Sequence, residues 1–110
     1  MSHPFHVYGA ALGLVSALRS LHGELVKTDR SLADQLRRAA SSVVLNIAEG
    51  NRRTGKDRLH FFRIAAGSAA EVRAALAVAQ AWGAIGAAPV AEAELDRVLA
   101  MLWRLTHRRN

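Results

Sequence analysis

The sequence contains no cysteine. This absence excludes disulfides within the chain, catalysis by a thiol and zinc sites built on cysteine. With 110 residues, the chain is still long enough to bury a hydrophobic core without a disulfide or a metal. A cysteine-free chain also fits a reducing compartment, and we expect the protein to be cytoplasmic.

Long apolar runs are missing as well. No segment approaches the roughly 20 consecutive apolar residues that span a bilayer. The stretch from Val7 to Leu18 is fairly apolar, but Arg19, His22 and Glu24 follow it in place of a small-residue cleavage site. We therefore expect neither a secretory signal nor a membrane partner.

Aromatic residues make up only 5% of the chain, whereas hydrophobic residues make up 51%. The apolar content is mostly Ala, Leu and Val, which suits close packing between helices. No segment shows the alternation of apolar and polar residues that predicts a strand, and no repeat or low-complexity linker divides the chain. These observations favour a single all-α domain over residues 1–110.

Apolar residues recur at spacings of three and four, as they do on one face of a helix. In the first segment they are Val7, Ala11, Leu14, Leu18, Leu21 and Leu25. Four such segments are separated by short breaks, and we place helices at about 4–27, 32–49, 55–82 and 90–107. We interpret Gly50 as the stop of the second helix. Long helices with short connections predict an antiparallel up-and-down four-helix bundle.

Positive charge is in excess, with 15 Lys and Arg against 9 Asp and Glu and a net charge of +6. It concentrates near the predicted turn between the second and third helices, at Arg52, Arg53, Lys56 and Arg58. Cationic side chains beside a helix N-terminus bind phosphate groups without reading a base sequence. We predict that these residues contact nucleic acid, with RNA favoured. The alternative is a solvated basic surface that has no such partner.

A second set of polar residues lies on the predicted second and third helices. Its members are Arg38, Asn46, Glu49, Arg63, Ser68 and Glu71. We predict that they form a partly buried network that fixes the helix register or a subunit interface. Acid–base catalysis is the competing interpretation, but Glu49 and Glu71 are too far apart in a helical hairpin to act together.

No other set of residues converges on a catalytic or metal site. His3 and His6 are three residues apart, but no carboxylate or cysteine accompanies them. The run from Gly50 to Lys56 has the glycine spacing of a phosphate-binding loop. It follows a helix instead of a strand, however, and Asp57 stands where that motif has Ser or Thr. We therefore expect no enzyme, no cofactor and no metal.

Three short motifs stand close together: Gln35-Leu-Arg-Arg-Ala39, Asn46-Ile-Ala-Glu-Gly50, and Gly67-Ser68 followed by Glu71. Together they resemble the signature of the bacterial four helix bundle protein family, also called the 23S rRNA intervening-sequence protein family. The resemblance extends over roughly residues 5–105. It implies a cytoplasmic α-bundle, often a pentamer, to which no catalytic residues are attributed. Accessory variability proteins of retroelements look like relatives, and those are basic pentamers that bind nucleic acid and a reverse transcriptase.

The sequence thus predicts a non-enzymatic, homo-oligomeric helical bundle. We expect it to bind nucleic acid through phosphate contacts from the basic turn, and the resemblance implies a homopentamer. The alternative is an oligomeric scaffold or adaptor for a protein partner, in which the basic charge has no nucleic-acid role.

Overall fold

The computed structural model describes residues 4–107, and His3, one of the two histidines considered above, lies outside them. Four helices make up this part of the chain: α1 (Pro4–Val26), α2 (Arg30–Asn51), α3 (Gly55–Ala81) and α4 (Pro89–Thr106). None of the described residues forms a strand. The all-α fold class that the sequence predicts is therefore confirmed.

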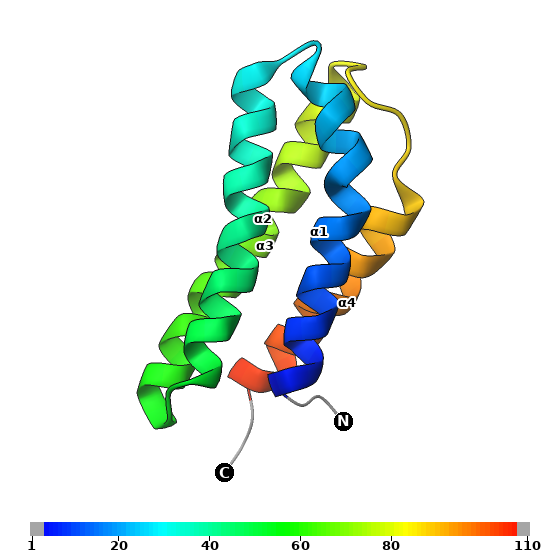
Figure 1. Ribbon diagram of the computed structural model, residues 1–110. Helices are drawn as coiled ribbons and strands as arrows, with labels where there is room; N and C mark the ends of the chain where they lie inside the picture. Colours follow the sequence, from blue (N-terminus) through cyan, green and yellow to red (C-terminus); the bar gives the residue numbers. More distant parts are fainter. Residues whose placement is uncertain (1–3, 108–110) are drawn as a thin grey trace.

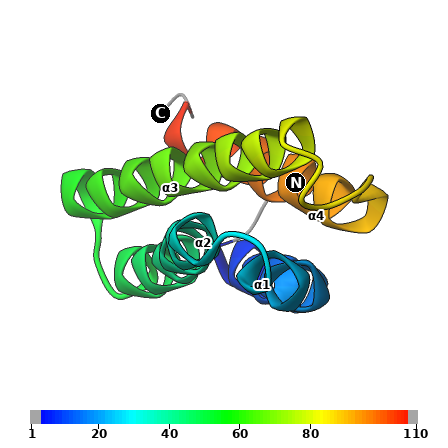
Figure 2. The same cartoon turned by 90° about the horizontal axis from the view of Figure 1, so that it is seen from above.

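The helices run alternately up and down, as Figure 1 shows. Each helix packs against the next one along the chain, and α4 closes the arrangement against α1. In Figure 2, α1 and α2 form one layer, and α3 and α4 form the other. The bundle is elongated, with extents of 46, 22 and 19 Å. The free end of the α2–α3 hairpin projects beyond α1 and α4 (Figure 1), so the connection between these two helices is well separated from the rest of the molecule.

The apolar faces of the four helices meet in one core. Each helix contributes fully buried side chains, for example Leu14 from α1, Val43 from α2, Phe62 from α3 and Leu95 from α4. Phe62 is the largest of the fully buried side chains, and no other aromatic side chain among residues 6–107 is buried. Burying an apolar side chain of this size contributes about 1.5–3 kcal/mol, so this core is the main source of stability.

No helix in residues 4–107 combines the length and the apolar character that crossing a bilayer requires.

The second helix is longer than predicted at both ends. It begins at Arg30 because the Asp29 side chain caps it, with Oδ1 accepting a hydrogen bond from the Leu32 N–H at 3.0 Å. At the other end α2 continues through Gly50 to Asn51. The prediction that Gly50 stops the helix was therefore wrong.

Gly50 instead allows close contact between α2 and α3. A Cβ atom at this position would lie 2.6 Å from Cε1 and 2.7 Å from Cδ1 of Phe62. Both residues are buried, so the Phe62 ring has little room to move away. The left-handed backbone that glycine tolerates occurs at Gly55, with φ of 58°, where α3 begins.

Candidate nucleic-acid interface

The predicted basic turn lies at the projecting end of the α2–α3 hairpin (Figure 1). A short connection, residues 52–54, joins the two helices. The backbone N–H groups of Arg52 and Arg53 donate to the carbonyl oxygens of Glu49 and Gly50, at 3.1 and 3.0 Å. These bonds satisfy two carbonyls at the end of α2 and leave the side chains of the connection exposed.

Arg52 and Lys56 are exposed cations of this turn that make few contacts with the protein. The Arg52 side chain is 79% exposed, and its Nη1 lies 3.9 Å from Oε1 of Glu49. Lys56 is exposed in the first turn of α3 and takes part in none of the ion pairs formed among residues 4–107. Both side chains are therefore available to an approaching anion.

Arg53 is held more firmly than its neighbours. Its Nε and Nη2 donate to Oε2 of Glu49 at 3.0 and 2.9 Å, and its Nη1 lies 3.8 Å from Oδ2 of Asp57. The guanidinium carbon also lies 5.0 Å from the centre of the Phe61 ring. These contacts partly neutralise Arg53 but fix its position at the surface.

Arg58 has a structural role within the turn. Its Nε donates to the Gly50 carbonyl at 3.1 Å, and its Nη2 donates to the Asn51 carbonyl at 3.2 Å. The side chain is partly buried. It therefore ties the start of α3 to the end of α2 and satisfies carbonyls that lack partners within their own helix.

Replacing Arg58 by alanine is expected to lower the free energy of unfolding by about 1–2 kcal/mol, because two charge-assisted hydrogen bonds are lost. Urea denaturation followed by circular dichroism measures this change. Lys56→Ala is the matched control, since it removes an exposed cation from the same turn, and it should stay within about 0.5 kcal/mol of the parent. Equal stability of the two variants would contradict a structural role for Arg58.

The turn as a whole keeps an excess of positive charge. Its four basic side chains are accompanied by two carboxylates, those of Glu49 and Asp57. The N-terminus of α3 lies in the same place and adds the favourable end of the helix dipole. This arrangement suits binding of phosphate groups. Phe61 is the aromatic side chain that contacts these cations, and one partly buried ring does not provide a surface on which a series of bases could stack.

Two members of the predicted polar network come together through a third residue. The hydroxyl groups of Ser42 and Ser68 are 2.7 Å apart and share a hydrogen bond between α2 and α3. Asn46 Nδ2 donates to the Ser42 hydroxyl at 3.0 Å and to the Ser42 carbonyl at 2.9 Å. Ser42, which the predicted set omits, is thus the centre of this cluster. Its position four residues before Asn46 was the available signal.

The other members do not join this cluster. Arg38 pairs with Asp34 at 3.0 Å on the exposed side of α2, and Glu49 pairs with Arg53. Arg63 and Glu71 are exposed and belong to none of the ion pairs within the described residues. One continuous network therefore does not form within a single chain.

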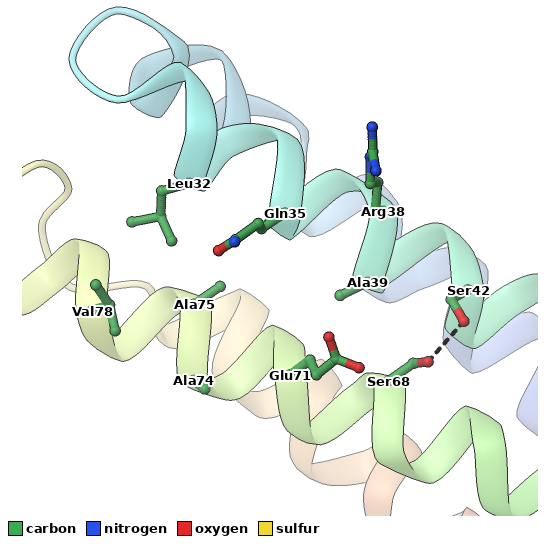
Figure 3. A pocket seen from close by; sticks show the side chains of 10 residues that line it. All are labelled: Leu32, Gln35, Arg38, Ala39, Ser42, Ser68, Glu71, Ala74, Ala75 and Val78. Atoms are coloured by element: carbon green, nitrogen blue, oxygen red, sulfur yellow. Dashed lines mark hydrogen bonds between the residues drawn. The ribbon is translucent and has the colours of Figure 1, made fainter.

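A groove of about 520 Å³ lies between α2 and α3 next to the serine pair, as Figure 3 shows. Gln35 and Glu71 extend into the space between the two helices, whereas Arg38 points away from α3 (Figure 3). Small and apolar side chains complete its lining. Glu71 is the only carboxylate in the groove, and no histidine or second acid lines it. The groove therefore lacks the pair of groups that acid–base catalysis needs.

Metal binding receives no support from the described part of the chain, in which no three His, Cys, Asp or Glu residues are grouped to hold an ion.

Comparisons with known proteins agree with this fold. A family model described as 23S rRNA-intervening sequence protein matches residues 4–104. A solved structure from Bacteroides thetaiotaomicron, of a protein with unknown function from the S23 ribosomal protein family, is similar with a TM-score of 0.79. The two sequences are 19% identical, and the match covers 93% of this chain and 99% of that one. At this identity the likeness shows the fold alone. A search of curated proteins found no match.

Proposed function

The chain belongs to the 23S rRNA-intervening sequence protein family, and from this premise we propose that it is a non-enzymatic, homo-oligomeric bundle that binds RNA. The resemblance carried by the three sequence motifs is confirmed. The family name associates its members with ribosomal RNA, which favours RNA over DNA as the partner. The compartment that fits this role is the cytoplasm.

The observation that carries the proposal is the exposure of Arg52 and Lys56 at the projecting end of the hairpin (Figure 1). A phosphate backbone can approach this end without meeting α1 or α4. Arg53 is oriented in advance by Glu49 and Asp57, so little side-chain entropy is lost when it contacts a phosphate. Arg58 stabilises the turn on which the other three cations, Arg52, Arg53 and Lys56, lie.

Self-association would repeat this weak contact several times on one particle. Exposed apolar side chains support such an interface: they are Ile64 and Val78 on α3, and Trp82 directly after it, the last at 80%. Arg63 and Glu71 lie on the same helix and have no ion-pair partner among the described residues, so they are available to a second copy. Pentameric assembly is the form that the family resemblance implies.

A salt series tests RNA binding. The logarithm of the binding constant for a structured RNA, measured by fluorescence anisotropy, should fall linearly with the logarithm of the salt concentration, with a slope of about −0.7 to −0.9 per phosphate contact. Light scattering on the same samples should give several times the mass of one chain. No binding at low salt, or binding that salt leaves unchanged, would refute the RNA proposal, and a strict monomer would refute the assembly.

A scaffold that binds a protein partner is the second candidate. It is favoured by two exposed aromatic side chains, Trp82 at 80% and Trp103 at 60%, because tryptophan is enriched in protein interfaces. Absence of RNA binding combined with a stable oligomer would support this candidate instead.

A further inference from the structure

A second groove, of about 390 Å³, lies between α1 and α2 and has a different character. Two cations, Arg19 from α1 and Arg37 from α2, line it together with His22. Ser16 from α1 and Ser41 from α2 also line it. The groove therefore gathers five side chains that can donate hydrogen bonds, and no carboxylate is among its lining residues.

The charges of Arg19 and Arg37 are not compensated within the described residues. Neither belongs to an ion pair, whereas Arg38, the neighbour of Arg37, is held by Asp34. Two guanidinium groups from different helices thus line one groove, and no described residue pairs with either of them. Like charges in one site repel each other, and a bound anion relieves that repulsion.

The donors match a phosphate group in kind and in charge. A guanidinium group presents a planar pair of N–H donors that fits two phosphate oxygens, and serine hydroxyls and the His22 ring can donate to the others. A terminal phosphate carries close to two negative charges at neutral pH, whereas a backbone phosphate carries one. The two arginines balance the terminal group better.

The groove also has room for the sugar or base that carries such a phosphate. Its volume lies in the range of small-molecule sites. Leu18 and Leu36 are buried beneath it, and Val15 forms a half-exposed apolar edge. A sugar or a base can lie against these side chains while the phosphate contacts the arginines.

We propose that the α1–α2 groove binds a terminal phosphate group, a phosphomonoester dianion carried by a nucleotide or by the 5′ end of an RNA. This site is separate from the basic turn, since Arg37 and Arg52 are about 22 Å apart along α2. It therefore goes beyond the proposed function and does not depend on it.

Titration of the protein with adenosine 5′-monophosphate, followed by calorimetry, tests the site, with adenosine as the matched ligand. We expect the monophosphate to bind and adenosine to bind much more weakly. The double variant Arg19→Ala/Arg37→Ala should weaken monophosphate binding by about tenfold or more, because charge-assisted hydrogen bonds are lost. Both residues are exposed, so circular dichroism should show an unchanged fold.

Arg73→Ala/Arg97→Ala is the control variant, since it removes the same charge from exposed positions on α3 and α4 that do not line the groove. Equal binding of adenosine and its monophosphate, or equal weakening by the two double variants, would overturn the proposal. A variant in which the cations of the basic turn are replaced by alanine should still bind the monophosphate. That result would show that this site does not depend on RNA binding by the turn.

A second arm of the experiment identifies the source of the phosphate. One short RNA is compared with and without its 5′-phosphate. Tighter binding of the phosphorylated form, lost in Arg19→Ala/Arg37→Ala, supports the RNA end as the source. Monophosphate binding without this preference supports a free nucleotide, and failure of both arms overturns the site.

Discussion

Replacement of Phe62 by alanine should be among the most destabilising single changes in this protein, at about 3–5 kcal/mol. Phe62 is the largest fully buried side chain, and it lies where the two helices of the projecting hairpin meet. Removing its ring loses apolar burial and leaves a cavity that the backbone of Gly50 cannot fill. Chemical denaturation followed by circular dichroism measures the loss, and Phe62→Leu provides a milder variant if the alanine variant is unfolded.

Phe61→Ala is the natural control because Phe61 is only partly buried and contacts Arg53 and His60 at the surface. Its cost should be well below that of Phe62→Ala, and the reverse order would contradict the packing described here. The contact can also be probed from the other helix. Gly50→Ala should destabilise the parent by about 1–3 kcal/mol through overpacking and should cost less in the Phe62→Leu background.

The helices were predictable from the sequence because their apolar periodicity records the core directly. Leu14, Val43 and Leu95 lie on the predicted stripes, and all three are fully buried. The role of Gly50 was not predictable in this way. A glycine near a helix end serves equally well as a stop or as a point of close approach, and only the position of Phe62 on the neighbouring helix distinguishes the two.

The sequence predicts where the basic turn lies, but not which of its cations are exposed and which one stabilises the turn. Arg52, Lys56 and Arg58 look alike in sequence, yet Arg58 alone reaches the open carbonyls at the end of α2. The choice of Asp34 as the partner of Arg38 follows from a local spacing of four residues. The α1–α2 groove has no local motif, because Arg19 and Arg37 lie far apart in the sequence and come to line one groove only when the helices pack.

The family motifs acquire a physical explanation from these contacts. Asn46 donates a hydrogen bond to Ser42, Ser42 bonds to Ser68, and Gly50 leaves room for the Phe62 ring, so three motif positions, Asn46, Gly50 and Ser68, take part in joining α2 to α3. These three motif residues therefore help to build the hairpin. The cations that the proposal assigns to RNA lie just beyond them, on the turn that this hairpin carries away from the rest of the bundle (Figure 1).

Replacing Arg52, Arg53 and Lys56 together by alanine is the most direct change to the proposed interface. Each lost phosphate contact should reduce the steepness of the salt dependence by about 0.7–0.9, so loss of all three should reduce it by about two units or more. At low salt the affinity for RNA should fall by about 100-fold. Glu49 adds to this effect, because its carboxylate loses the Arg53 partner and then repels the phosphates.

The contribution of net charge must be separated from that of position. Lys27→Ala/Arg73→Ala/Arg97→Ala removes the same three charges away from the turn, so it lowers long-range attraction equally but removes none of the proposed contacts. If RNA binding depends on the cations of the turn, this control variant loses far less affinity and keeps its salt slope. Both triple variants should keep their helix content and oligomeric mass. If the two triple variants lose affinity equally, the basic turn is not the interface, and RNA responds only to the overall charge of the particle.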